Sequence, residues 1–436
     1  MSTINLRERD AVIQSLRAGV VPRLGQHLIQ VGRSRELETF IQDIVRIVDG
    51  GSTFRLVIGE YGAGKTFFLN LVRSIGLEKK LVVINADLNP DRRLHATGGQ
   101  ARSLYTELMR NLATRTKPEG GALAGVVEKF VANTIAEART KKAVPNEVIH
   151  MKLEQLKEMV NGYDFAEVIA KYWRGFEEGS EQLKSDAIRW LRGEFSTKTD
   201  AKQALGVRTI IDDSSFFDQL KLLARFVRLA GYSGLLVCLD EMVNLYKLAS
   251  TQARNSNYEQ ILRILNDSLQ GSAEGLGFIL GGTPEFIFDP RRGLFSYPAL
   301  QSRLAENSFA KNGLVDFTGP VVRLANLSPE DLFVLLGKLR NVYAFGDETK
   351  YLLPDPALQA FMEHCQKRLG ETYFRTPRTT IAAFVNLLSV LEQNPGANWQ
   401  TLLGQIEVQK DIGGANDLKI EADSSSDNDE FTTFKL

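Results

Sequence analysis

The sequence predicts an α/β fold in which a five-stranded parallel sheet carries a large helical insertion and is followed by an all-helical lid domain. Two observations predict the sheet: a Gly-rich motif at residues 59–66 follows one short apolar run, and a second apolar run ends in Asp240-Glu241. A third predicts the insertion, because residues 117–207 have helical apolar spacing and no convincing strand. A strand–helix–strand unit takes about 30 residues, so the two motifs lie much farther apart than the core requires.

The Gly-rich motif reads Gly-Glu-Tyr-Gly-Ala-Gly-Lys-Thr, which is the P-loop pattern. A predicted strand at 54–58 precedes it and helical spacing follows it, which is the context that a P-loop requires. Its glycines allow backbone N–H groups to surround a polyphosphate at a helix N-terminus. Lys65 would then reach the β- and γ-phosphates of ATP, and the Thr66 hydroxyl would ligate Mg²⁺. The residues expected to hold the nucleotide here are Gly59, Glu60, Tyr61, Gly62, Ala63, Gly64, Lys65, Thr66 and Phe67.

Composition excludes several other classes of protein. The 436 residues suffice for two or three domains, and 43% hydrophobic with 24% charged residues is ordinary for a soluble globular chain. The formal net charge is +0, so no bulk field attracts nucleic acid or acidic lipid. The two cysteines, Cys238 and Cys365, form no metal-binding or disulfide pattern. No apolar run approaches the roughly 20 residues of a membrane span, so we expect a cytoplasmic protein without membrane contact.

The segment before the P-loop is a candidate for binding the adenine base. Residues 1–27 are expected to form an N-terminal helical segment, and residues 28–116 the first part of the core. In many P-loop ATPases a Gly-Arg-x-x-Glu-Leu segment, here residues 32–37, lines the adenine pocket. The residues expected to line it are Ile29, Val31, Gly32 and Arg33. An ordinary helix with Ser34 as its N-cap is the alternative.

The insertion at 117–207 carries no catalytic pattern. We expect Trp173 and Trp190 to be buried within it. Its Lys and Arg residues alternate with Glu, which favours a solvated helical face over a DNA-binding groove.

The core is predicted to resume at 208–325 with the remaining catalytic residues. The run 235–239 ends in two acids, so a central strand would deliver both carboxylates to the ligand-binding edge of the sheet. Asp240 would hold Mg²⁺, and Glu241 would orient and deprotonate the attacking water. Thr283 follows a fourth strand and would hold the same water. Arg303 lies where an arginine finger would enter a neighbouring subunit's site; a surface salt bridge is the alternative.

The C-terminal part is predicted to be helical. Residues 326–412 are expected to form the lid, beginning at Ser328-Pro329 with an N-cap and a proline at the first helical position. Within it Arg378, in preference to Arg375, would reach back to the γ-phosphate. Residues 413–436 are acidic and poor in apolar residues, so a disordered tail is expected there.

Taken together, these motifs resemble the AAA+ superfamily, on its initiator side (origin-recognition-type ATPases and transposition regulators). More closely, residues 16–22 and the runs 224–232 and 236–242 are similar to one group, the BrxD ATP-binding proteins of the bacterial BREX anti-phage defence system. The resemblance implies ATP and Mg²⁺ as cofactors, other BREX proteins as partners, DNA as a candidate partner, and a cytoplasmic location. Unlike the initiators, the chain has no room for a winged helix after the lid, which argues against sequence-specific duplex binding.

The predicted function is therefore a Mg²⁺-dependent ATPase, with turnover that is weak or stimulated by partners. Its subunits would self-associate so that Arg303 of one completes the site of the next, and ATP would control engagement with DNA or defence partners. One alternative is a nucleotide-gated scaffold with little turnover; another is an initiator-like or transposition-regulator-like DNA-loading ATPase outside BREX. A nuclease has little support, because Asp212-Asp213 is better explained as a helix cap.

Overall fold

The computed structural model describes residues 4–310, 316–369 and 377–405. It contains one five-stranded sheet in the order β2-β3-β4-β1-β5, and every neighbouring pair is parallel. The predicted α/β fold with a five-stranded parallel sheet is thus confirmed. The strands are β1 (Thr53–Ile58), β2 (Val82–Asp87), β3 (Leu235–Asp240), β4 (Leu276–Gly282) and β5 (Val321–Arg323).

The central strands are covered on both faces, which explains why they are apolar at nearly every position. All residues of β1, β3 and β4 are buried. Successive side chains alternate between two hydrophobic clusters, as the period of a strand requires. On β3, for example, Val237 packs in one cluster and Leu236 and Cys238 in the other.

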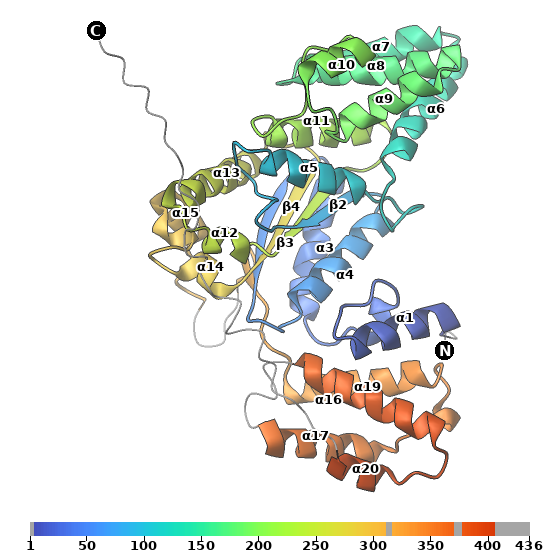
Figure 1. The fold of residues 1–436 in the computed structure, drawn as a ribbon, viewed down its shortest axis with the longest axis vertical. Coiled ribbons are helices and arrows are strands. Elements are labelled where there is room, and N and C mark those ends of the chain that lie inside the picture. The colour runs from blue at the N-terminus through green and yellow to red at the C-terminus, as the bar shows by residue number, and fades with distance from the viewer. Residues whose placement is uncertain (1–3, 311–315, 370–376, 406–436) are drawn as a thin grey trace.

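Helices form a layer on each face of the sheet (Figure 1). One layer contains α3 (Ser34–Val48) and α4 (Lys65–Glu78). The other contains α5 (Gln100–Arg110), α11 (Phe216–Leu229) and α13 (Thr251–Leu269). Shorter helices follow β3 and β4, namely α12 (Val243–Lys247), α14 (Pro284–Phe288), a 3-10 turn (Leu294–Ser296) and α15 (Pro298–Leu304).

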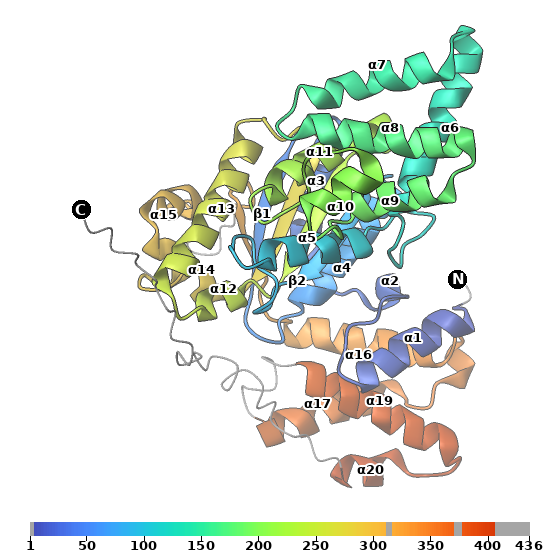
Figure 2. The same cartoon turned by 45° about the horizontal axis from the view of Figure 1, so that its top comes forward.

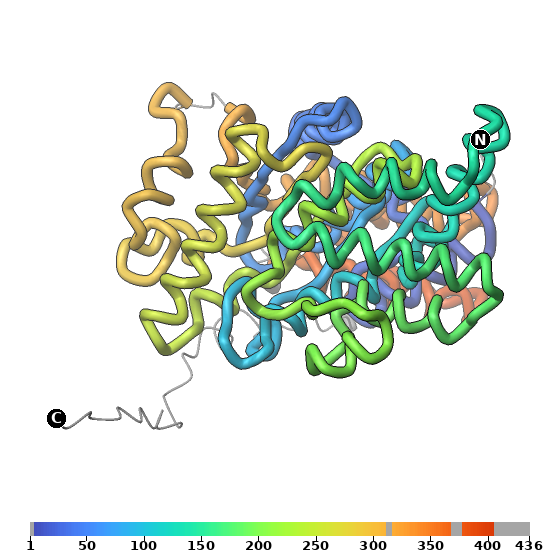
Figure 3. Tube along the Cα trace, turned by 90° about the horizontal axis from the view of Figure 1, so that it is seen from above, coloured from blue at the N-terminus to red at the C-terminus, as the bar shows by residue number. Residues whose placement is uncertain are grey.

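Five further helices lie between β2 and β3 in the sequence. They are α6 (Leu123–Lys141), α7 (Pro145–Lys157), α8 (Gly162–Glu178), α9 (Glu181–Leu191) and α10 (Lys198–Leu205). Their apolar residues join the same hydrophobic cluster as one face of the sheet. Trp173 and Trp190 are buried as predicted, and the Trp190 indole donates a hydrogen bond to the Thr209 carbonyl across 2.8 Å. Figure 3 shows the turn between α6 and α7 at one side of the molecule and α15 at the other.

The C-terminal helices pack with the N-terminal ones. α16 (Pro329–Tyr343), a 3-10 turn (Glu348–Lys350), α17 (Asp355–Leu369), α19 (Pro377–Gln393) and α20 (Trp399–Gln405) follow the sheet. α1 (Leu6–Arg17) and α2 (Gln26–Ile29) share a separate hydrophobic cluster with them. Figure 2 shows α1 lying beside α16 and α19. α16 begins at the predicted residue, where Ser328 and Asp331 form a capping box. The predicted acidic tail lies outside the described residues.

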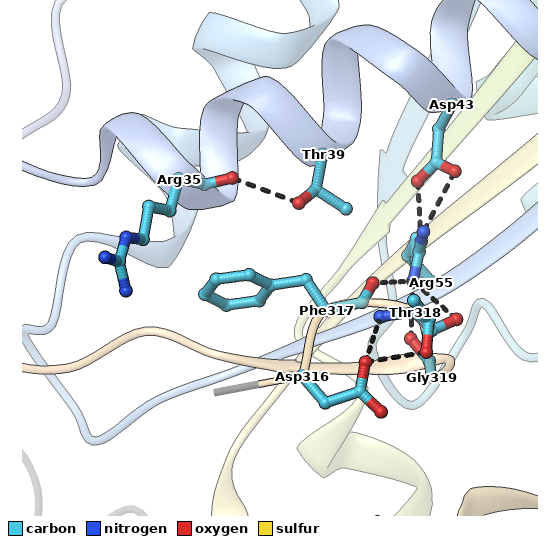
Figure 4. Close-up of polar contacts among 8 residues, drawn as sticks. All are labelled: Arg35, Thr39, Asp43, Arg55, Asp316, Phe317, Thr318 and Gly319. Atoms are coloured by element: carbon cyan, nitrogen blue, oxygen red, sulfur yellow. Dashed lines mark hydrogen bonds and ion pairs between the residues drawn. The ribbon is translucent and has the colours of Figure 1, made fainter. Parts of the chain in front are cut away.

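A buried arginine holds the chain where it enters β5. Arg55 on β1 and Asp43 on α3 form a bidentate ion pair with N–O distances of 2.6 and 3.0 Å. The Arg55 guanidinium also donates to the carbonyl of Phe317 across 2.8 Å and to that of Gly319 (Figure 4). Because both side chains are more than 90% buried, this network fixes β5 against β1, directly before the P-loop.

Candidate nucleotide-binding site

The P-loop connects β1 to α4 and has the backbone that its glycines predict. Gly62 and Gly64 have φ values of +81° and +80°, which favour glycine. A Cβ on Gly59 would lie 3.0 Å from the Leu324 carbonyl oxygen, so the loop also needs glycine there for close packing. The Lys65 ammonium donates to the carbonyls of Gly59 and Glu60 across 2.9 and 3.0 Å. The amine is therefore held at the loop that would surround a phosphate.

Two elements far apart in sequence meet beside Lys65. The Thr66 hydroxyl donates a hydrogen bond to Asp240 Oδ2 across 2.7 Å. The other oxygen, Asp240 Oδ1, accepts the backbone N–H of Glu241 across 2.8 Å. A Cβ on Gly281 of β4 would lie 2.4 Å from Asp240 Oδ1, so only glycine leaves space for this carboxylate. The structure thus brings together Lys65, Thr66, Asp240 and Glu241.

Burial and neighbouring charges shift the pKa values of Lys65 and Glu241. Partial burial lowers the pKa of Lys65, while Asp240 and Glu241 oppose that shift by stabilising the ammonium. Desolvation raises the pKa of Glu241, and the negative charges of Asp240 and Asp87 raise it further. Glu241 has a φ of +57°, an uncommon conformation for a residue with a Cβ. Such features concentrate at functional sites.

A pocket of about 250 Å³ opens beside the P-loop. One wall consists of P-loop and α4 residues; the other comes from the N-terminal and C-terminal helices. Ile29, Val31, Gly32, Arg33 and Phe67 all line it, as the hypothesis of an adenine pocket requires. Of the P-loop residues, Tyr61 to Thr66 line the pocket, whereas Gly59 and Glu60 face a neighbouring cavity.

Arg33 contacts the P-loop directly. Its φ is +60°, and its guanidinium donates to the carbonyls of Ala63 and, across 3.2 Å, Ala325. Burial lowers the pKa of Arg33, while Glu36 and Asp331 stabilise its charge. The side chain thereby links the start of α3, the P-loop and the segment after β5.

Arg378 also reaches the pocket, from the start of α19. Its guanidinium donates to the Tyr61 hydroxyl across 3.3 Å, and its carbon lies 5.8 Å from the centre of the Tyr61 ring. A Cβ on Gly19 would lie 3.3 Å from Arg378 Cδ, so the N-terminal segment supports this side chain. Arg375, the alternative residue, lies outside the described part of the chain.

Thr283 and Arg303 do not line the pocket. Thr283 follows β4, and its hydroxyl oxygen is buried with no hydrogen-bond partner among the described residues. An orphaned hydroxyl at this edge of the sheet suits a ligand or a water molecule. Arg303 is exposed on α15 and donates to the Asn266 side chain across 2.7 Å and to the Ala299 carbonyl across 2.9 Å. Its guanidinium is therefore held by its own subunit, outside the pocket.

Sequence reasoning missed several site residues. Asp87 ends β2 and is the strand-register neighbour of Asp240; the polar sequence Asn85-Ala86-Asp87 was the available signal. Asp331 lies against Gly32, where a Cβ would be 3.0 Å from its carboxylate. The pocket residues contributed by distant N-terminal and C-terminal segments had no local signal for nucleotide binding; they are Leu16, Gly19, Val20, Val21, Pro22, Leu327, Leu335, Pro377 and Ile381.

The carboxylates of Asp212 and Asp213 accept hydrogen bonds from backbone N–H groups, but Asp213 does not cap the helix that the sequence predicted. Asp213 accepts hydrogen bonds from the backbone N–H groups of Gly99 and Arg102 across 2.7 and 2.8 Å, so it caps α5. The prediction that it caps the helix beginning at Phe216 is therefore wrong. Asp212 instead accepts from the N–H groups of Ser214 and Ser215 before that helix. In the described residues, no group of three or more His, Cys, Asp or Glu side chains is arranged to hold a metal.

Among the described helices, none is both long enough and apolar enough to span a membrane. Residues 4–407 match the sequence model of the family described as BREX system ATP-binding protein BrxC/D. The match therefore includes the P-loop, the acid pair, the helical stretch between β2 and β3, and the C-terminal helices. No curated protein matches the chain significantly.

Proposed function

We propose that this chain, which belongs to the family of BREX system ATP-binding proteins BrxC/D, is a Mg²⁺-dependent AAA+ ATPase that hydrolyses ATP to ADP and phosphate. The proposal depends mainly on one observation: Lys65, Thr66, Asp240 and Glu241 converge at one edge of the sheet. A protein that only bound nucleotide would not need Glu241.

Each of these groups suits one part of the reaction. Lys65 would bind the β- and γ-phosphates after releasing the two loop carbonyls that it now contacts. Glu241 would accept a proton from the attacking water, and its raised pKa makes it a better base than an ordinary carboxylate. The orphaned Thr283 hydroxyl would hold that water in position.

The residues present also fit a magnesium ion. The Thr66 hydroxyl and Asp240 carboxylate are hard oxygen donors already in contact. Mg²⁺ in nucleotide sites characteristically takes one or two protein ligands and completes its shell with phosphates and water. When bound, the ion would neutralise phosphate charge.

Because Arg303 would act in a neighbouring subunit, a single subunit would turn over ATP weakly. Because the Arg303 guanidinium is exposed and lies outside its own subunit's pocket, a neighbouring subunit is the site that it would complete. Self-association would thus stimulate hydrolysis, and the nucleotide state would control engagement with other BREX proteins and with DNA in the cytoplasm.

The helices between residues 117 and 207 would be an insertion available to such partners. Residues 28–116 and 208–325 would be the two parts of the ATPase core, with residues 1–27 as an N-terminal segment. Residues 326–412 would serve as the lid that carries Arg378, and 413–436 as a tail.

The test is Glu241→Gln in the full-length protein, with Glu158→Gln on the exposed surface as a matched control. Calorimetry should give unchanged ATP affinity for both variants. Phosphate release should fall by about 10²–10⁴-fold in Glu241→Gln alone. Unchanged turnover in this variant would remove Glu241 from the mechanism.

A second candidate function is a nucleotide-gated scaffold with little turnover. The position of Arg303, held by Asn266 and Ala299 of its own subunit, favours it. ATP binding without phosphate release, with and without DNA and at concentrations that produce oligomers, would support the scaffold over the ATPase.

A further inference from the structure

A second cavity, of about 420 Å³, lies between α5 and the turn that follows α9. It is separate from the nucleotide pocket and shares no lining residue with it. Figure 1 shows α5 beside β2, beneath α9 and α11. The polar side chains that line the cavity are Arg92, Arg102, Ser103, Thr106, Glu107, Arg110 and Glu194.

The cavity is defined by well-packed walls. Gly193 has a φ of +72°, and a Cβ there would lie 3.2 Å from the Tyr105 ring and 3.4 Å from the Thr106 hydroxyl. The Tyr105 hydroxyl donates to the Leu191 carbonyl across 3.1 Å, which ties α5 to α9. Asp213 already caps the N-terminus of α5. Any anion in the cavity would therefore be bound by side chains.

The cavity contains more unpaired cationic and hydroxyl donors than carboxylates to receive them. Arg92 is paired with Glu107 across 3.1 Å, and the second oxygen of Glu107 accepts from the Asn111 amide. Among the residues that the structure describes, the Arg102 side chain makes only one long contact, of 3.5 Å, to the Phe195 carbonyl. Within the described residues, no hydrogen bond or ion pair occupies the side chains of Arg110, Ser103 and Thr106. Of the two carboxylates in the lining, Glu107 and Glu194, only Glu194 has no partner in the described part of the chain.

Three of the unpaired side chains form a row along α5. Arg102, Thr106 and Arg110 are spaced by four residues and so lie on one face of α5. The eight-residue interval between the two arginines corresponds to about 12 Å along the helix axis. A nucleic-acid strand carries one phosphate per about 3.4 Å of its axis, so it would present several phosphates along a row of this length.

We propose that this row, Arg102, Thr106 and Arg110, binds phosphate groups of the backbone of a DNA strand. Guanidinium groups match phosphate oxygens in a bidentate manner, and hydroxyl groups add positioning contacts without reading the sequence. The proposal rests on the part of the proposed function in which the protein engages DNA, and it adds a contact site for that DNA. It does not depend on ATP hydrolysis.

The test measures binding of labelled single-stranded and duplex oligonucleotides to the full-length protein by fluorescence anisotropy over a range of salt concentrations. Arg102→Ala/Arg110→Ala should weaken binding about tenfold and reduce the log–log salt slope by about 0.7–0.9 for each arginine removed. Arg139→Ala, an exposed arginine on α6, removes a charge elsewhere and should change affinity less than twofold. Glu194→Gln should strengthen binding.

Calorimetric ATP affinity should be equal in all these variants, which establishes that they are folded and that the nucleotide pocket is intact. Equal losses in Arg139→Ala and in each of the single variants Arg102→Ala and Arg110→Ala would overturn the proposal, since binding would then follow total charge. Tripolyphosphate binding without oligonucleotide binding would also overturn it. If the wild-type protein hydrolyses ATP but binds no oligonucleotide, this site alone is contradicted; if it binds oligonucleotide through the row but does not hydrolyse ATP, only the ATPase is contradicted.

Discussion

The Thr66 hydroxyl and the Asp240 carboxylate lie 2.7 Å apart, although 174 residues separate them in the sequence. The contact joins the start of α4 to the end of β3 at the sheet edge where α/β folds bind their ligands. It is the geometry from which the proposed magnesium dependence follows.

Thr66→Val should weaken the response to magnesium, because valine has nearly the same shape as threonine but no oxygen ligand. We expect the Mg²⁺ concentration for half-maximal ATP hydrolysis to rise by about tenfold or more, corresponding to about 1.5 kcal/mol for a lost charge-assisted contact. Thr66→Ser keeps the hydroxyl and should behave like the wild type. An equal magnesium response in all three proteins would contradict this role.

The raised pKa of Glu241 predicts an acid limb in the rate profile. Its carboxylate must be ionised to act as a base, so kcat should fall as the pH decreases through a value above the ordinary 4.5. A limb at or below 4.5 would exclude Glu241 as the titrating base.

The same shift predicts how stability depends on pH. Because the pKa of Glu241 is higher in the folded than in the unfolded protein, the folded state binds more protons, and this group's contribution is lost as the pH rises through the folded value. Glu241→Gln should therefore be more thermally stable than the wild type at pH 8, and the difference should shrink on acidification. Differential scanning calorimetry checks this, with Glu158→Gln as the control.

Arg303→Ala should reduce hydrolysis by about 10³-fold, the lower end of the range for arginine fingers. Because Arg303 is proposed to act in a neighbouring subunit, mixing this variant with Lys65→Ala should restore part of the activity, although neither protein is active alone. Phosphate release at increasing mixing ratios measures this effect. Full activity of Arg303→Ala as a monomer would contradict the assignment.

Arg378 should contribute to ATP affinity through its charge rather than through its hydrogen bond to Tyr61. Arg378→Ala removes a cation from the pocket, and we expect the Kd for ATP to increase about tenfold, whereas AMP affinity should change little because AMP lacks the γ-phosphate. Tyr61→Phe removes only the hydroxyl that Arg378 contacts and should change the Kd by less than threefold. Calorimetry with both nucleotides separates loss of a phosphate contact from general damage to the pocket.

The ion pair between Arg55 and Asp43 should be essential for stability. Asp43→Asn leaves a buried guanidinium without its counter-charge, so the free energy of unfolding should fall by about 3–5 kcal/mol. Asp49→Asn, on the surface at the end of the same helix, is the control and should change it by less than about 0.5 kcal/mol. Urea denaturation followed by tryptophan fluorescence measures both values; similar stabilities would show that the network is dispensable.

The sequence was sufficient to predict the parts of the site that depend on local patterns. The P-loop spacing determines the loop at Gly62 and Gly64, and an apolar run ending in acids is enough to locate Asp240 at a strand end. By contrast, the packing of α1 against α19 joins segments far apart in the chain, and no local periodicity encodes such a contact. Asp87 was missed because β2 continues three residues beyond the apolar run at 81–84, and its pairing with β3 extends to Asp87.

The positive φ of Glu241 has a consequence for directed evolution. A residue with a Cβ in this conformation is held at a cost of roughly 1 kcal/mol or more, which glycine would avoid. A library screened only for survival of heat should therefore enrich glycine at position 241, and the enriched proteins should still fold and bind nucleotide while no longer hydrolysing it.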